Sequence, residues 1–140
     1  MKINNECARK ILFEVEKIPY GETLTVAKLQ EKIVDYSDED VLTIVTLFNK
    51  ERYLCVLDKA SYDDNDVFKE HKIKCLTEKG YKTLDSIRSD EIWNLIKEKV
   101  NDFEELSIYT IFDIANRIIN VKHNKLLDLP INLIFQPNRW

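Results

Sequence analysis

Glycine, proline and methionine are scarce in this 140-residue chain, with two, three and one copies. The two isolated glycines, Gly21 and Gly80, cannot build the glycine-rich loops that hold phosphates. The sequence also lacks an H-E-x-x-H motif and a G-x-S-x-G turn, and His71 and His123 stand apart. We therefore predict a protein that is not an enzyme and that needs no cofactor and no metal.

Cysteine is uncommon as well, and basic charge is not in excess. Cys7, Cys55 and Cys75 have no C-x-x-C spacing and sit within apolar patterns, so we expect buried thiols. The net charge of -4 divides evenly, because residues 1–57 hold eight basic and ten acidic groups and residues 58–140 hold thirteen and fifteen. Phosphate neutralisation dominates non-specific DNA affinity, and the composition shows no basic lobe for it.

Long apolar runs are missing too. No uninterrupted apolar stretch approaches the length that spans a membrane, and charges interrupt the apolar positions of residues 1–17. The mixture of 44% hydrophobic and 33% charged residues is typical of a globular protein. We expect a soluble, cytoplasmic protein with a packed core and no membrane partner.

Three segments with helical periodicity open the chain. Asn4 or Asn5 is placed to cap the first, which must end at the "PYG" sequence. Leu24 fits a very short strand, and Thr25 then caps the second segment. Ser37 begins the third with a capping-box-like pattern. Three helices are therefore expected before any long strand.

The hydrophobic period then changes to two. Residues 52–58 and 71–76 are predicted to pair as a two-stranded hairpin, and the polar segment 59–70 between them suits a mobile loop. In the second strand two apolar residues alternate with two lysines: Ile73 and Cys75 against Lys72 and Lys74. Three helices followed by a hairpin is the chain order of a winged helix, whose wing would be this loop.

More helices are expected after the hairpin. Thr77 is placed to cap the first of them, and Gly80 in its first turn lets helix and sheet backbones approach closely. Apolar residues then recur at helical spacing: Tyr81, Leu84, Ile87. Ser89 starts another helix, and residues 107–121 form the last.

The stretch "LTEKGYKTLDSIRSDEIW", Leu76 to Trp93, resembles the signature of an uncharacterised phage, prophage and bacterial family, domain of unknown function 2513. "YSDEDVLTIVTLFNKERYL", Tyr36 to Leu54, is similar to that family as well, and the resemblance extends to about residue 121. Glu78 and Tyr81 depart from the family pattern, and the residues after 121 look additional. The resemblance implies a winged-helix-like fold and a mobile-element setting, and no established activity comes with it.

A nucleic-acid surface can be proposed on the third helix and the hairpin. Thr43, Thr46 and Lys50 project together from the helix, opposite its apolar stripe. Lys72 and Lys74 add cations on the second strand. Threonine can contact a thymine methyl and lysine a phosphate, but the helix has no arginine, asparagine or glutamine pair that reads base edges. The missing basic footprint favours an ordinary exposed polar surface at these positions over DNA contact.

The C-terminal third suggests a protein partner instead. Apolar residues cover about half of the helix at 108–121, which is wider than one packed face requires. Residues 127–136 then alternate like an edge strand or an extended arm. The arm can fold back on its own domain, join a second subunit or bind another protein. Leu133, Phe135 and Trp140 are its candidate partner-binding residues.

These observations combine into one prediction. We expect an α+β, mostly helical fold: a winged-helix-like domain over residues 1–121, with extra C-terminal helices and an extended arm at 122–140. We expect a phage or prophage accessory or regulatory protein that acts by macromolecular binding, of which a winged-helix DNA-binding regulator is one form. The alternative is a protein-interaction module, a homodimer or host-protein binder, without DNA binding. Frequent Asn, Ile and Lys suggest an AT-rich genome.

Overall fold

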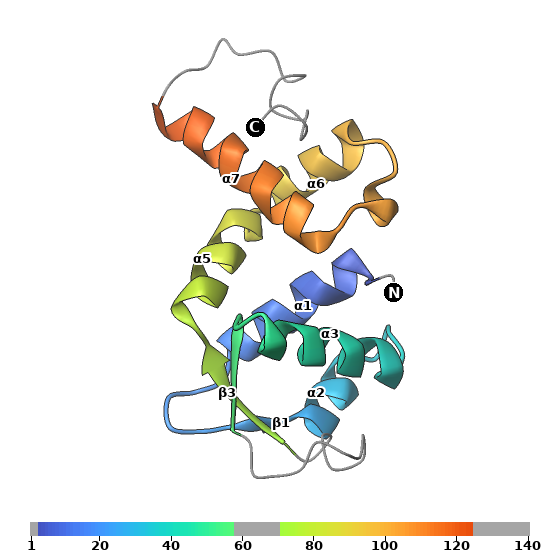
Figure 1. Cartoon of the computed structure of the whole chain (residues 1–140), viewed down its shortest axis with the longest axis vertical. Helices are drawn as coiled ribbons and strands as arrows, with labels where there is room; N and C mark the ends of the chain where they lie inside the picture. The colour runs from blue at the N-terminus through green and yellow to red at the C-terminus, as the bar shows by residue number, and fades with distance from the viewer. Residues whose placement is uncertain (1–2, 58–70, 125–140) are drawn as a thin grey trace. The chain divides into compact units, whose positions relative to one another are not determined.

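The computed structural model describes residues 3–57 and 71–124, with side chains up to residue 121. The chain divides into two compact units, the first being Ile3–Leu84 and the second beginning at Asp85. The described residues are mostly helical and contain one small antiparallel sheet (Figure 1), so the α+β, mostly helical prediction is confirmed. None of the helices in these ranges is long and apolar enough to cross a membrane.

The first unit contains three helices and three strands, followed by the first turns of α5 (Glu78–Ile87). In chain order they are α1 (Asn5–Glu16), β1 (Leu24–Thr25), α2 (Val26–Lys32), α3 (Asp38–Lys50), β2 (Leu54–Leu57) and β3 (Lys72–Leu76). The predicted caps are confirmed. Side-chain oxygens of Asn4, Thr25 and Ser37 accept backbone N–H groups at 3.0, 3.2 and 3.1 Å. Each cap satisfies one of the donors that a helix start leaves unpaired.

Apolar faces of the three helices and the sheet make the core of this unit. Helix α1 packs against α3 and β3, while α2 packs against α3 and β1. The largest fully buried side chains among these elements are Ile11, Leu12, Leu29, Ile44, Phe48 and Ile73. Burying one such side chain is worth roughly 1.5–3 kcal/mol.

The sheet has the strand order β1-β3-β2 with antiparallel pairs throughout. The predicted hairpin is confirmed, since β2 pairs with β3. The sheet also has a third strand that pattern reasoning did not pair: Leu24 lies opposite Ile73, and Thr25 opposite Lys72. β3 is therefore the central strand. The predicted wing at 59–70 lies outside the described residues.

A shift of register interrupts the hairpin. Leu57 and Val56 face Lys72 and Ile73, but the next pair is Cys55 with Cys75, so the register skips Lys74. An extra residue of this kind is a β-bulge, and it reverses the alternation of side chains beyond it.

The bulge corrects one prediction about β3. Ile73 and Leu76 are three residues apart, yet both are buried, with 0% and 3% of their surface exposed. In a regular strand they would point to opposite faces. Strict alternation predicted Cys75 as the inward partner of Ile73, but Cys75 is only half-buried. Because Lys74 is an extra residue in the strand, Leu76 takes the inward position instead of Cys75.

Helix α3 ends in a tight reversal. Arg52 has a left-handed backbone with φ 64°, its N–H donates to the Asn49 carbonyl at 3.2 Å, and the Tyr53 N–H donates to the Phe48 carbonyl at 2.8 Å. These two bonds define a Schellman motif. The rings of Phe48 and Tyr53 meet edge to face, 5.4 Å between centroids, and supply the apolar contact that accompanies this motif.

The start of α5 is built onto that reversal. The Thr77 hydroxyl donates to the Arg52 carbonyl at 2.6 Å and accepts the Gly80 N–H at 3.1 Å. A Cβ atom on Gly80 would overlap the carbonyl oxygen of Tyr53. The predicted cap and the predicted close approach at Gly80 are both confirmed. Tyr81, expected on the buried side, is 42% exposed, because α5 turns Gly80 and Leu84 inward.

The second unit holds the end of α5, α6 (Asp90–Lys99), the 3-10 helix η1 (Phe103–Glu105) and α7 (Ile108–Asn124). The Ser89 hydroxyl accepts the Ile92 N–H at 3.3 Å and caps α6, as predicted. α6 packs against α7, and Trp93 contacts Phe103 edge to face at 5.3 Å. The predicted division into a 1–121 domain and a 122–140 extension stays a prediction.

Candidate functional site

Three of the predicted contact residues lie along α3. Thr46 and Lys50 are exposed, and Thr43 is half-buried. The Thr46 hydroxyl donates its proton to the Leu42 carbonyl at 2.7 Å. Toward a ligand, Thr46 therefore offers its methyl group and its oxygen lone pairs, but no donor.

The first turn of α3 carries the opposite charge. Asp38, Glu39 and Asp40 are all exposed there, where the helix dipole stabilises carboxylates. The same carboxylates repel a polyanion that approaches this end. Any phosphate contact of α3 is therefore favoured at its C-terminal half, near Lys50.

The two predicted lysines of β3 also reach solvent. Lys72 and Lys74 are exposed on either side of Ile73, which is fully buried. Since α1 packs against β3, the lysine side chains point away from the core. The central strand of the sheet thus presents two ammonium groups outward.

The five predicted residues do not form one cluster. Lys50 precedes β2, whose first residue, Leu54, pairs with Leu76, whereas Lys72 pairs with the last residue, Leu57. With a rise of about 3.3 Å per residue, roughly 10 Å of strand separates these two ends of the hairpin. Lys50 therefore lies near one end of the hairpin and Lys72 at the other.

Sequence reasoning missed a second cationic group at the end of α3. Lys79 of α5 donates to the Glu51 carbonyl at 3.0 Å, and its ammonium lies 4.5 Å from the centroid of the Tyr53 ring. Arg52 is exposed at the same reversal, two positions after Lys50 in the sequence. The sequence "NKERY" shows that Arg52 follows Lys50 closely. Only the left-handed backbone shows that Arg52 lies in the reversal after α3.

The three thiols differ from the expectation of uniform burial. Cys7 is fully buried, and burial raises its pKa to about 12, with a further contribution from Asp40. Cys55 and Cys75 are half-buried and face each other across β2 and β3. The prediction of buried thiols is confirmed for Cys7 and wrong for the other two.

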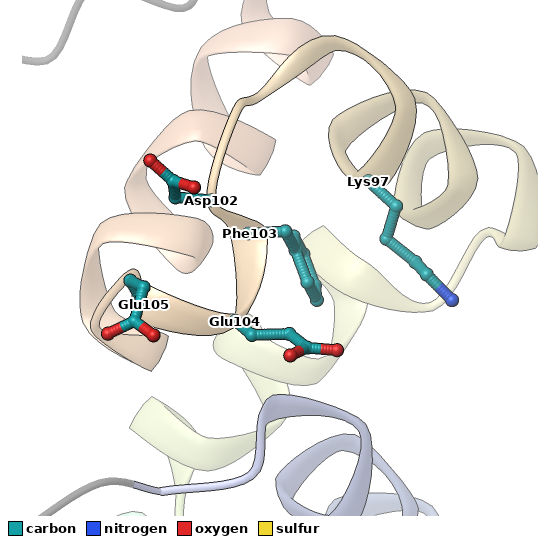
Figure 2. A pocket seen from close by; sticks show the side chains of 5 residues that line it. All are labelled: Lys97, Asp102, Phe103, Glu104 and Glu105. Carbon is teal, nitrogen blue, oxygen red and sulfur yellow. The ribbon is translucent and has the colours of Figure 1, made fainter.

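A hollow of about 350 Å³ lies at the turn between α6 and α7 in the second unit. Its lining residues are Lys97, Asp102, Phe103, Glu104 and Glu105. Figure 2 shows that the three carboxylates point in different directions instead of converging. Within the described ranges, no three His, Cys, Asp or Glu side chains are grouped to hold a metal ion. The mostly acidic lining disfavours phosphate ligands.

The partner-binding prediction depends partly on residues that the structure does not describe. Leu133, Phe135 and Trp140 lie outside the described residues. The wide apolar arc of α7 is mostly covered in the structure, with these members buried: Ile108, Ile111, Phe112, Ile114, Ala115 and Ile118. Ile119 and Val121 are half-buried. The alternative of a protein-interaction module stays a prediction.

Comparison with known proteins gives one match. No curated protein and no solved structure is similar to the chain at a significant level. One family model, described as "Hypothetical protein (DUF2513)", matches residues 2–107. The match covers Ile3–Leu84 of the first unit and the second unit as far as the residue before α7. The chain therefore belongs to the DUF2513 family, as the resemblance of residues 36–54 and 76–93 predicts.

Proposed function

We propose that residues 3–84 form a winged-helix domain that binds double-stranded DNA, within a phage- or prophage-associated accessory regulator. One observation carries the proposal: the order helix, strand, helix, helix, strand, strand, with the sheet order β1-β3-β2. In helix-turn-helix proteins the second helix of the motif enters the major groove. Here α2 and α3 are the consecutive packed pair, so α3 takes that role.

The charges on α3 select which part of the helix meets DNA. The three carboxylates of its first turn oppose phosphates, while Lys50 and Arg52 stand at its other end. Thr43 and Thr46 lie between and offer methyl groups to thymine. Lys72 and Lys74 extend the contact to the backbone beside the groove.

These few cations support weak, salt-sensitive binding. Each neutralised phosphate contributes a slope of roughly -0.9 in a plot of log affinity against log salt concentration. If Lys50, Lys72 and Lys74 each contact one phosphate, the slope is about -3. Such a protein binds DNA with little sequence preference of its own, which suits an accessory factor.

Fluorescence anisotropy with a labelled AT-rich duplex, repeated over a range of salt concentrations, tests the proposal. Reversing two charges on β3, by Lys72→Glu together with Lys74→Glu, is expected to weaken binding about tenfold or more and to make the salt slope shallower by about two. The matched control is Lys97→Glu with Lys99→Glu, which reverses two exposed charges on α6. Its affinity is expected to stay close to that of the unmodified chain.

Two results would overturn the proposal. One is the absence of salt-sensitive binding at protein concentrations up to about 100 µM, the weak end of non-specific DNA affinity. The other is an equal loss of affinity in the β3 and α6 variants, since that pattern would reflect net charge and not a surface of the first unit.

The protein-interaction alternative has its own test. A chain truncated after Lys122 removes the predicted arm, and light scattering compares its mass with that of the full chain. A change of oligomeric state would favour the alternative, whereas an unchanged monomer would argue against it.

A further inference from the structure

Cys55 and Cys75 occupy directly opposed positions in the antiparallel pair β2 and β3. Opposed residues in such a ladder have Cα atoms roughly 4.5–5.5 Å apart. A disulfide needs roughly 4.4–6.8 Å between the same atoms. The backbone of this hairpin therefore already holds the two residues within bonding range.

The bulge creates this pairing. Leu57 and Val56 face Lys72 and Ile73, and continuing that register would set Cys55 opposite Lys74. Because the register skips Lys74, Cys55 meets Cys75. The register shift at Lys74 is thus what sets the two cysteines opposite each other in this chain.

The two thiols also interact with each other, and their residues are only partly buried. Burial raises the pKa of Cys75 above its ordinary value, and the adjacent Cys55 thiol raises it further, while Lys74 lowers it. Both residues are half-buried and in the free thiol form, in contrast to Cys7, which is fully buried. A small reagent can therefore reach the pair but not Cys7.

We propose that Cys55 and Cys75 form a redox-modifiable dithiol, which closes to a cross-strand disulfide by exchange with a low-molecular-weight disulfide such as glutathione disulfide. The inference is independent of DNA binding. In a reducing compartment the pair stays open, and it closes when the ratio of disulfide to thiol rises.

The exchange balances in two steps. One cysteine thiolate attacks a sulfur of glutathione disulfide, forms a mixed disulfide and releases one glutathione thiolate. The second cysteine thiolate then attacks the protein sulfur of the mixed disulfide and releases the other glutathione. The protein dithiol gives up two electrons and two protons, and the reagent is reduced to two glutathione thiols.

Thiol counting on the full chain tests the proposal. The protein is equilibrated with graded ratios of glutathione disulfide to glutathione, quenched in acid, labelled with N-ethylmaleimide in denaturant and weighed by mass spectrometry. The chain has three cysteines, so the reduced protein takes three labels. The oxidised protein is expected to take one, on Cys7, and tryptic peptides 53–59 and 75–79 are expected to be joined.

The same measurement in urea is the control for geometry. Equilibrium between the closed disulfide and the mixed disulfides is expected to favour closure about tenfold or more in the folded chain relative to the unfolded chain, because the hairpin holds the thiols together. Equal closure in both states would overturn the proposal. A disulfide that includes Cys7, or one that forms only between two molecules, would also overturn it.

Single substitutions separate the two partners. Cys55→Ser and Cys75→Ser are each expected to stop at one bound glutathione, whereas Cys7→Ala is expected to close as the unmodified chain does. Closure that survives either serine substitution would contradict the pairing. The comparison in urea uses the unmodified chain, so the proposal stays testable even if a serine variant folds poorly.

Discussion

Gly80 is a residue at which one added methyl group should destabilise the fold. Its Cα faces the carbonyl oxygen of Tyr53, which also accepts the Thr77 N–H at 3.0 Å and so cannot move freely. A side chain at position 80 must push two backbone segments apart.

We expect Gly80→Ala to lower the free energy of unfolding by about 2–3 kcal/mol, although alanine gains about 1 kcal/mol of helix propensity. Denaturant unfolding followed by circular dichroism measures the change. Lys82→Ala in the same helix is the matched control. Lys82 is exposed and forms a surface ion pair with Glu78, with 3.3 Å between the charged atoms. This substitution should lower the free energy of unfolding by no more than about 0.5 kcal/mol. A Gly80→Ala chain as stable as this control would show that the close approach is absent.

At the scale of single residues, the sequence correctly predicted the interactions that a side chain makes with residues nearby in the chain. The caps Asn4, Ser37 and Thr77 follow from local hydrogen bonds between a short polar side chain and a nearby N–H. Tyr81 was misplaced, because helical spacing alone does not show which of two adjacent stripes faces inward. Contact with Tyr53 selects the Gly80 side.

At the scale of secondary-structure elements, α3 ends at a backbone conformation that glycine adopts more readily than Arg52. Arg52 occupies the left-handed position of the Schellman motif, which costs a residue with a Cβ atom roughly 1–2 kcal/mol. The Thr77 hydroxyl bonds to the Arg52 carbonyl and so does not depend on its side chain.

Arg52→Gly is expected to raise the free energy of unfolding by about 1 kcal/mol, after allowance for the extra freedom of glycine in the unfolded chain. Thermal or denaturant midpoints will show the gain. Glu51→Gly is the control, because Glu51 has φ -85° and profits nothing from glycine, so this variant should be less stable. If Arg52→Gly were the less stable of the two, the guanidinium group would have to make contacts that outweigh the strain.

The hydrophobic periodicity predicted which helices and strands form, but it did not determine how the strands pair. Periods of 3.6 and 2 placed α3, β2 and β3 correctly. The pairing of β1 with β3 was missed, because two residues are too short to show a period. The skip at Lys74 was missed as well, so the Cys55–Cys75 pair could not be found from the sequence.

For the whole molecule, several ionisable groups act in the same direction with pH. Burial raises the pKa of Cys7, Tyr36, Tyr53 and Cys75, and the hydrogen bond to Asp35 raises that of Lys10. A group whose pKa is higher in the folded chain contributes its full stability below the unfolded pKa and loses it as pH rises through the folded pKa. Stability should therefore fall on the alkaline side.

Cys7 dominates this effect between its ordinary value of 9.0 and its folded value of about 12. In that window the free energy of unfolding is expected to fall by about 1.4 kcal/mol per pH unit through Cys7 alone. Urea unfolding at a series of pH values from neutral to about 11 measures the slope. Cys7→Ala should be less stable at neutral pH but show a shallower alkaline slope, and an unchanged slope would exclude Cys7 as the cause.

The division of the molecule into two units was not predicted. A search for linkers looks for flexible composition, and the boundary between Leu84 and Asp85 lies within the continuous helix α5. The charge balance of the chain also hid local contrast, because a sum over the chain does not show that the first turn of α3 is acidic while its last turn carries Lys50. The candidate site depends on that contrast and on the register of β3.

The extra residue in β3 also affects how relatives within the DUF2513 family should be compared. A homologue that lacks a counterpart of Lys74 must bring its two inward apolar residues one position closer in sequence to keep the same core. Gaps at this point of an alignment are then structurally meaningful, because they keep both apolar residues on the inward face although their spacing in sequence changes.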